Sequence, residues 1–446
     1  MYNKWSKLTT KNAPKVRYSH AIGTTGKYLV LHGGYNLENG FPLWLDDLLV
    51  LSKLEWSQVK VSTERPIPCA RYSHTLINLH DIPSTQGTFY LFGGDDGGYR
   101  EQQLQHLHQG YTFGHYFNDL WKLTTHLVDD TYVEGVWTQI SLPEDSILPT
   151  PRTSHTAIAM LNCPNALDSS FFPVPVDVCM VLFGGLTTKK TAKLAKLELI
   201  DSNELWIMTP SPTDPDTVVW KLHTSKSKTI ISSRHGHSAT TDETGKTMYI
   251  YGGQTHAAKS LLSDLWSWSV MHSWTKLHDG TIGKSKSLSS PFPNGLVYSS
   301  LSIKNNFLIL FGGAHGCNSR CFTESKTWLW SIETQIWQLV SDVDDIHPPH
   351  RYRHSLTNIL DQQGESVAVL FGGESYGVTK KYHNDVWMFT NTEKKTTSHD
   401  DYFIWSFFVI VCIIVCSFVI KKSENMKLIQ AMIQKSKRKK PEMEMV

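Results

Sequence analysis

Cysteine is scarce in this chain, with seven residues among 446, which is too few for a fold held together by disulfide bonds. Two of the seven lie inside an apolar segment near the C-terminus. Cys163 with Cys179, and Cys317 with Cys321, are near enough in sequence to form bridges, and Cys69 is left over. Such bridges form in an exoplasmic compartment and not in the cytosol. The sequence leaves the oxidation state of both pairs open.

The chain also lacks a strong charge of either sign, because 43 basic and 41 acidic residues leave a net charge of +2. Residues 421–446 hold eight Lys or Arg and three Glu, so residues 1–420 carry a small excess of acid. A surface that binds a phosphate backbone needs clustered basic residues. We therefore expect no nucleic acid among the partners of this protein.

Signals for export and for catalysis are missing as well. The first ten residues, MYNKWSKLTT, have neither the apolar core nor the cleavage site of a secretion signal, and no N-x-S/T site occurs anywhere. No nucleophile elbow, phosphate loop, metalloprotease helix or paired-carboxylate motif stands out. We therefore expect no enzyme activity and no cofactor.

The chain does contain a repeat. Six Trp-containing segments recur, at Trp5, Trp56, Trp137, Trp220, Trp274 and Trp337. In phase with them, six apolar runs each end in two glycines: Gly33 and Gly34, Gly93 and Gly94, Gly184 and Gly185, Gly252 and Gly253, Gly312 and Gly313, Gly372 and Gly373. A period of several tens of residues indicates a solenoid or a propeller.

Two further elements accompany the glycine pairs. An Arg-x-x-His segment precedes the apolar run in five repeats, with its arginine at Arg17, Arg71, Arg152, Arg234 and Arg351. An acid followed by aliphatic and aromatic residues comes after the pair, at Asp47, Asp119, Glu204, Asp264 and Asp385. The fifth repeat departs from both patterns, with Gly295 and Tyr298 in the places of the Arg-x-x-His segment and Lys326 in place of the acid.

Each repeat holds four short segments rich in β-branched and aromatic residues, separated by turn residues, and this predicts a four-stranded antiparallel meander. The glycine pair fits a sharp turn or a close backbone approach at the end of the second strand. The glycine pair, a following aromatic position and the Trp near the last strand resemble the Kelch repeat over residues 1–390. The resemblance implies an all-β fold, a six-bladed β-propeller.

The two ends of the repeat region fit together. The sixth repeat stops at NDVWMFTNTEKK, with no fourth Trp-containing segment after it, and KWSKL with Trp5 stands at the start of the chain. We predict that this N-terminal strand completes the last sheet, so that residues 1–392 form a closed propeller.

An uncharged run of 19 residues, 402–420, follows a short linker, residues 393–401. As a helix it would span roughly 29 Å, about the thickness of the hydrocarbon core of a bilayer. We therefore predict a single-pass membrane protein with a basic tail, residues 421–446. In the cytoplasm this tail would either lie against an anionic leaflet through its amphipathic face or be solvated.

The side of the membrane on which the propeller lies is left open. The eight basic residues after the span place the tail in the cytoplasm and the propeller in the exoplasm. Without an entry signal, the span would insert as a C-terminal anchor and leave the propeller in the cytosol. The sequence supports either topology.

The joint departure of the fifth repeat predicts that the arginine and the acid are structural partners, as in Arg71 with Asp119 or Arg351 with Asp385. A buried Arg that lost its carboxylate would cost about 3–5 kcal/mol, so the two residues change together. The alternative is that the arginines converge on an acidic ligand, because related Kelch propellers bind peptides at a face made of loops. We interpret the histidines of the same segments as packed, hydrogen-bonded side chains.

Two long insertions are the expected recognition elements, because long loops on a rigid scaffold often carry binding residues. The first contributes Tyr99, Arg100, His106, His108, Tyr111, Phe113 and His115, and the second contributes Phe171 and Phe172. The His-x-His pair of the first loop has no third ligand at a suitable spacing, so we predict no metal site.

These observations predict a membrane-tethered module that binds a protein or peptide partner through loops on the propeller face. Two alternatives remain open at this point. One is a propeller enzyme with a metal site in a loop, and the other is the substrate-recognition subunit of a ubiquitin ligase.

Overall fold

The structure is a computed structural model that describes residues 2–392 except 39, 63, 80–83, 98–114, 130–131, 144, 162, 164–177, 191–196, 212–213, 215, 225–228, 281–290, 316–321, 341–345, 362 and 378. The chain divides into two units, and the larger one comprises Asn3–Asn391. Its described residues form β-strands and no helix. The predicted span 402–420, its linker and its tail lie outside the described residues. Within those residues, no helix has the length and apolarity needed to cross a bilayer.

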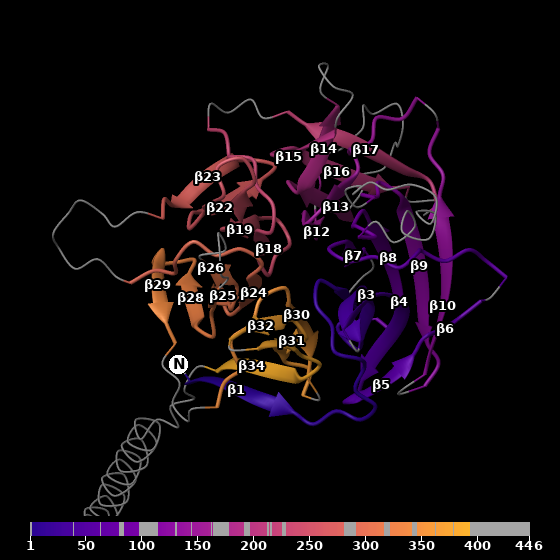
Figure 1. Cartoon of the computed structure of the whole chain (residues 1–446), viewed down its shortest axis with the longest axis horizontal. Helices are drawn as coiled ribbons and strands as arrows, with labels where there is room; N and C mark the ends of the chain where they lie inside the picture. The colour runs from indigo at the N-terminus through magenta and orange to yellow at the C-terminus, as the bar shows by residue number, and fades with distance from the viewer. Residues whose placement is uncertain are drawn as a thin grey trace, which may run out of the picture. The chain divides into compact units, whose positions relative to one another are not determined.

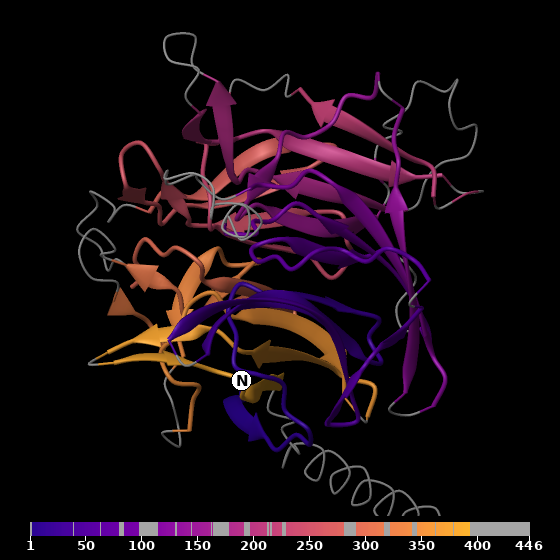
Figure 2. The same cartoon turned by 45° about the vertical axis from the view of Figure 1, so that its right-hand side comes forward.

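Six antiparallel sheets make up the larger unit and lie around a common axis (Figure 1, Figure 2). Sheets 1 to 3 comprise β2 (Ala21–Thr24), β3 (Leu29–Glu38), β4 (Phe41–Ser52) and β5 (Glu55–Gln58); β7 (Thr75–Asn78), β8 (Gln86–Phe92), β9 (Leu120–Leu127) and β10 (Val133–Ile140); β12 (Thr156–Leu161), β13 (Val178–Phe183), β16 (Leu205–Pro210) and β17 (Val218–His223).

Sheets 4 to 6 repeat this meander. They comprise β18 (Ser238–Thr241), β19 (Met248–Tyr251), β22 (Leu265–Ser269) and β23 (Ser273–His278); β24 (Ser300–Lys304), β25 (Phe307–Phe311), β28 (Thr327–Ser331) and β29 (Ile336–Leu339); β30 (Ser355–Leu360), β31 (Ser366–Phe371), β34 (Val386–Thr392) and β1 (Tyr2–Leu8). The N-terminal strand β1 is thus hydrogen-bonded to β34 at the outer edge of sheet 6 (Figure 1).

Four small sheets form in the connections between the second and third strands of sheets 3 to 6, and the first of them also includes a strand that precedes sheet 3. They comprise β11 (Arg152–Thr153), β14 (Leu186–Lys190) and β15 (Leu197–Asp201); β20 (Gln254–Thr255) and β21 (Ser260–Leu261); β26 (Ala314–His315) and β27 (Phe322–Thr323); β32 (Glu374–Tyr376) and β33 (Lys380–Tyr382). A further short strand, β6 (Lys60–Val61), pairs in parallel with β10 and extends sheet 2 to five strands.

The first strands of the six sheets surround the axis. They neighbour one another in the order β2, β7, β12, β18, β24, β30, and β30 neighbours β2 again. Between them lies a cavity of about 380 Å³, lined by short polar and aliphatic side chains of all six strands, such as Thr24, Asn78 and Ile303. The hydrophobic cores lie farther out, between neighbouring sheets.

The tryptophan of each outer strand packs against the neighbouring sheet. In every case its partner is the ring directly before that sheet's glycine pair, at centroid distances of 4.9–5.5 Å: Trp56 with Phe371, Trp137 with His32, Trp220 with Phe92, Trp274 with Phe183, Trp337 with Tyr251 and Trp5 with Phe311. Trp5 also donates its indole N–H to Thr327 Oγ1 at 2.8 Å. The N-terminal strand therefore makes the same contact between sheets as the five others.

The glycine pairs turn the chain where a side chain would not fit. In the second repeat, Gly93 and Gly94 have φ angles of +67° and +100°, a region that L-residues rarely adopt. A Cβ atom on Gly93 would lie 2.8 Å from the carbonyl oxygen of Arg152, and one on Gly94 would lie 2.9 Å from that of Tyr72. These turns bring each sheet's end against the Arg-x-x-His segments of its own and the next repeat, and we call this end of the ring the glycine-pair face.

Candidate functional site

The six segments that precede the first strands form a closed ring of backbone hydrogen bonds on the glycine-pair face. The residue before the histidine position of each segment donates its N–H to the carbonyl oxygen of its counterpart in the preceding repeat, at 2.6–3.1 Å. The six residues are Ser19, Ser73, Ser154, Gly236, Tyr298 and Arg353, and Ser19 donates to Arg353. All six have φ angles between +53° and +61°.

Four of these ring positions carry a small residue, and the other two carry a large one. A positive φ is unusual for side chains as bulky as those of Tyr298 and Arg353, and such backbone strain concentrates at functional sites. The Tyr298 hydroxyl lies 3.4 Å from Ser154 Oγ, two repeats away. The two large side chains thus occupy space that the small ring residues leave free.

The five repeated arginines are ion-paired within their own sheets. All five side chains are fully buried, and their guanidinium groups lie 2.6–2.8 Å from a carboxylate oxygen: Arg17 from Asp47, Arg71 from Asp119, Arg152 from Glu204, Arg234 from Asp264 and Arg351 from Asp385. In each case the guanidinium also donates to the carbonyl oxygen of the first glycine of the pair. Both pairs named from the sequence, Arg71 with Asp119 and Arg351 with Asp385, are therefore present.

Three of the five acids in these pairs, Glu204, Asp264 and Asp385, have lowered pKa values. Burial by itself would raise the pKa of the Asp385 carboxyl, but the hydrogen bonds and charge of Arg351 and the indole N–H of Trp387 outweigh it and lower the pKa to about 2. The equivalent groups of the fourth repeat, Arg234 and the indole N–H of Trp266, act on Asp264, whose pKa is also lowered. An acidic ligand would therefore have to displace the carboxylates that these buried arginines already bind.

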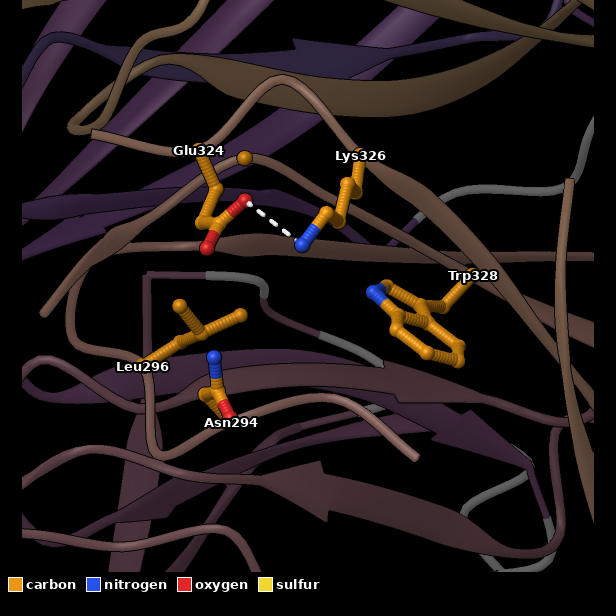
Figure 3. A pocket seen from close by; sticks show the side chains of 6 residues that line it. Asn294, Leu296, Glu324, Lys326 and Trp328 are labelled. Carbon is orange, nitrogen blue, oxygen red and sulfur yellow. Dashed lines mark ion pairs between the residues drawn. The ribbon is translucent and has the colours of Figure 1, made fainter. Parts of the chain in front are cut away.

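The fifth sheet lacks the ion pair, and the sequence assignment of its Arg-x-x-His segment was wrong by one residue at both positions, because Ser299, and not Tyr298, takes the place of the histidine. Leu296, and not Gly295, takes the place of the arginine, because its carbonyl oxygen accepts the hydrogen bond from Gly253 N–H that the arginine carbonyls accept in other repeats. The repeat has no arginine to align here, so the sequence alone did not fix the register. Lys326 does take the place of the acid and lies 3.8 Å from Glu324 (Figure 3).

The histidines of the repeated segments are buried and neutral. Burial, together with the nearby arginines, lowers the pKa of His20 and of His155 to about 3. The Nε2 atom of His20 lies 2.9 Å from Ser355 Oγ, and that of His155 lies 3.1 Å from Thr75 Oγ1. Each bond joins one repeat to its neighbour, as expected for packed, hydrogen-bonded side chains.

A cluster of aromatic and charged side chains covers the axis on the glycine-pair face. We call it the axial cluster and define it by six residues: Tyr18, Tyr298, Tyr352, Arg353, Glu374 and Lys380. The Arg353 guanidinium lies 4.5 Å from the ring centroid of Tyr298, 5.2 Å from that of Tyr352 and 5.4 Å from that of Tyr18. Such cation–π contacts hold the Arg353 guanidinium among the three tyrosine rings.

A buried carboxylate lies at the centre of this cluster. Glu374 is fully buried, and Arg353 Nη1 approaches its Oε1 at 3.2 Å while Lys380 Nζ approaches its Oε2 at 2.6 Å. Burial would lower the pKa of the Lys380 ammonium, but Glu374 and Tyr382 outweigh burial and raise it. Burial and Glu374 likewise raise the pKa of the Tyr18 phenol. The cluster therefore keeps Arg353 and Lys380 as cations at neutral pH, and the phenols of Tyr18 and Tyr352 keep their protons.

More tyrosines surround the cluster and reach solvent. Tyr376 and Tyr382 lie beside Lys380, and Tyr35 packs against Tyr18 and Tyr72. Tyr376 is 38% exposed, and next to its strand Phe322 is 58% exposed. Tyrosine and arginine are the residues that most often dominate protein interfaces. The cluster and its rim thus offer a rigid, aromatic contact surface.

Most of the predicted recognition residues lie outside the described residues: Tyr99, Arg100, His106, His108, Tyr111, Phe113, Phe171 and Phe172, and also the pair Cys317 and Cys321. His115 is described and exposed. Its N–H donates to Asp96 Oδ1 at 3.2 Å, and its ring packs on Phe117. A role for these residues in binding a partner stays a prediction.

The described residues that flank the two insertions lie at opposite ends of the sheets. Gly93 and Gly94, shortly before the first insertion, lie on the glycine-pair face. Residues 164–177 interrupt the hairpin of β12 and β13 beyond the pairing of Leu161 with Val178, which is the end far from Gly184. Next to this second insertion, a disulfide joins Cys163 to Cys179. A single partner surface on the glycine-pair face can therefore include the flanks of the first insertion only.

Sequence reasoning missed the axial cluster. Its members come from the first, fifth and sixth repeats, so no local motif unites them. One signal was available, since Tyr298 and Arg353 stand where the other repeats carry Ser or Gly. Among the described residues, no group of three or more His, Cys, Asp or Glu side chains is arranged to hold a metal ion.

Comparisons with known proteins bear on the fold and the family. Residues 173–399, slightly more than half of the chain, match the family model described as the KLHDC2/KLHL20/DRC7 Kelch-repeats domain. The chain is similar to the solved structure "Structure of YjhT", with a TM-score of 0.51 and 13% sequence identity over 85% of this chain and 97% of that chain. No curated protein matches. The structural likeness concerns the fold alone, and it supports the predicted β-propeller.

Proposed function

Because the chain belongs to the family of Kelch-repeat domains, whose β-propellers are general scaffolds for protein interaction, we propose that its body binds a protein partner at the glycine-pair face. The observation that carries this proposal is the axial cluster with its exposed rim. It gathers three tyrosines, an arginine and a lysine over one end of the ring, next to the exposed side chains of Tyr376 and Phe322.

The axial cluster and its rim are better suited to bind a partner than the repeated arginines. The five arginines are buried and paired with carboxylates, so binding an acidic ligand would first break those pairs. The rim residues need no such rearrangement. Aromatic side chains fixed on a rigid scaffold lose little entropy on binding, which is why they recur in interfaces.

A crosslinking experiment tests the proposed face. A photoreactive amino acid placed at Phe322 in the full-length protein, in its own membrane, should form adducts with a small set of partner proteins. The matched control carries the same group at Ile336 on β29, which is 43% exposed on the outer edge of sheet 5. Equal adduct patterns at both positions would contradict the proposal.

The scaffold that we propose is a six-bladed propeller whose last blade is completed by β1. The sheet order β1-β34-β31-β30, the ring of six backbone hydrogen bonds and the contact of Trp5 with Phe311 all support this closure.

We further propose that residues 402–420 anchor the protein in a bilayer and that the propeller lies on the exoplasmic side. The uncharged run of 19 residues and the eight basic residues after it support this topology. The bond between Cys163 and Cys179 supports it as well, because disulfides persist in oxidising compartments. In sealed vesicles with the cytoplasmic side outward, protease should spare the propeller, and digestion of the propeller there would contradict this topology.

A further inference from the structure

Lys380 lies in a cage that is built like a receptor for an ammonium group. Its Nζ atom is 5.1 Å from the ring centroid of Tyr382, 5.2 Å from that of Tyr18 and 5.3 Å from that of Tyr376. The carboxylate of Glu374 completes the cage at 2.6 Å. Aromatic rings around a cation, with an acid close by, are the arrangement by which proteins bind quaternary ammonium groups and methylated lysine.

The charge of this site does not require Lys380. Glu374 is fully buried and needs one cation beside it, because an unpaired buried carboxylate is strongly destabilising. Arg353 supplies that cation at 3.2 Å, from a position fixed in the backbone ring and held by three tyrosines. If the Lys380 side chain left the cage, Glu374 would therefore remain paired.

The position of Lys380 also allows its side chain to leave the cage. It begins β33, which pairs with β32 through only three residue pairs, and its side chain is 29% exposed. Tyr376, at the end of β32, forms one wall of the cage and is itself 38% exposed. Release of the lysine would thus open the cage toward solvent on the glycine-pair face without disturbing a main sheet.

We propose that the cage of Tyr18, Tyr376, Tyr382 and Glu374 is a binding site for a methylated lysine of the protein partner, and that Lys380 fills it as an internal substitute until that ligand displaces it. This inference rests on the proposed function, because it names the chemistry by which the glycine-pair face would recognise its partner. A primary ammonium is strongly hydrated, and each methyl group lowers the cost of moving the cation from water into an aromatic cage. A trimethylated lysine can therefore displace the tethered primary ammonium of Lys380.

Calorimetric titration of the full-length protein in detergent micelles tests the cage. The probe is a short peptide with one trimethyllysine, and the control peptide carries a neutral tert-butyl isostere of the same shape. We expect Lys380→Ala to bind the trimethyllysine peptide at least tenfold more tightly than the unmodified protein does, because the internal competitor is gone. We also expect the neutral isostere to bind neither form.

A second substitution in the Lys380→Ala background tests whether the gain in affinity comes from the cage. Tyr376→Ala in the Lys380→Ala background should lose the gain, whereas Ile336→Ala in the same background should keep it, and thermal melts of all variants establish that they are folded. Equal affinity of the Lys380→Ala variant and the unmodified protein, or equal binding of the isostere, would overturn the inference. If the cage fails in this way while adducts still form at Phe322, only this inference falls, and the proposed partner face stands.

Discussion

Two arginines of the sixth repeat, Arg351 and the partly exposed Arg353, have different roles. Arg351 is fully buried, and both of its terminal nitrogens donate to Asp385, at 2.7 and 2.9 Å. Arg353 lies over the axis, where three tyrosine rings surround its guanidinium and a single oxygen of Glu374 accepts from it. The first arginine is buried in an ion pair, and the second belongs to a surface that a partner can reach.

The structural role of the repeated pair makes a prediction for Arg71 and Asp119. Replacing either partner alone, by Arg71→Ala or Asp119→Asn, should lower the free energy of unfolding by about 3–5 kcal/mol, because a buried charge or its unsatisfied partner remains. The double variant should lose about as much as one single variant, and urea unfolding measures this coupling. Losses that simply add would contradict a structural pair.

A surface pair provides the matched control. Lys15 and Glu38 approach to 3.0 Å, but their side chains are 56% and 51% exposed. Exposed pairs of this kind contribute less than about 1 kcal/mol. Lys15→Ala should therefore leave the unfolding midpoint almost unchanged.

The buried histidines predict a loss of stability in acid. The pKa of His20, His32 and His155 is lowered to about 3, chiefly by burial, while an unfolded chain takes up their protons near pH 6.5. Below pH 6.5 the unfolded state therefore binds more protons than the folded state, so stability is full above that pH and falls as the pH drops toward 3. The expected loss is about 1.4 kcal/mol per pH unit for each such histidine.

Urea unfolding at a series of pH values measures this loss. The urea midpoint should decrease steadily from pH 6.5 to pH 4.5. In the His155→Gln variant it should decrease less over the same interval, because one buried histidine no longer contributes. A midpoint that is constant over this interval would show that the histidines are protonated in the folded protein as well.

At the scale of the element, the fifth sheet shows what a repeat is like without its ion pair. Leu296 replaces the arginine and Lys326 replaces the acid, and a small cavity lined by these two residues, Asn294, Glu324 and Trp328 lies between them (Figure 3). In sheets 2, 3, 4 and 6 the indole N–H at the position of Trp328 donates to the acid. The backbone hydrogen bonds of the other sheets are retained around the missing pair, since Gly253 N–H donates to the Leu296 carbonyl oxygen and Leu296 N–H to that of Leu262.

The fifth sheet should therefore accept the pair of the other repeats. Leu296→Arg alone should destabilise the protein by about 3–5 kcal/mol, because it buries a guanidinium beside a lysine. Adding Lys326→Asp should restore most of this loss, since the new carboxylate can pair with the guanidinium and accept from Trp328. Chemical unfolding of the two variants decides this, and a double variant no more stable than the single one would count against the equivalence of Leu296 with the arginines.

At the scale of the whole molecule, the strand β1 carries the connection between the last sheet and its neighbour. Trp5 is 2% exposed and touches Phe311 of sheet 5 as well as Phe389 of its own sheet. Deleting residues 1–10 should lower the melting temperature strongly, because it removes both the outer strand and this contact. Trp5→Ala alone should cost about 3–5 kcal/mol, as for other buried tryptophans.

Circular dichroism melts of the deletion, of Trp5→Ala and of a control variant measure the effect. Thr9→Ala, at an exposed position just after β1, is the control and should change stability by no more than about 0.5 kcal/mol. An unchanged melting temperature after the deletion would refute the closure by β1.

The sequence by itself determined the elements of this protein. The in-phase glycine pairs and Trp segments located the strands, because a meander needs a tight turn and an apolar outer strand once per repeat. The paired change at Lys326 also indicated that arginine and acid are partners, since a buried charge cannot lose its counter-ion. Both requirements are local, so each can be recognised in the sequence of a single repeat.

Only the tertiary structure decided which side chains come together on the axis. Tyr18, Tyr298, Arg353 and Glu374 belong to the first, fifth and sixth repeats, and they come together because the ring brings the first repeat next to the sixth. The same holds for the register of Leu296 and for the opposite ends of the sheets at which the described residues flanking the two insertions lie. The physical reason is that a contact across a closed ring depends on how all six sheets pack, and no single repeat contains that information.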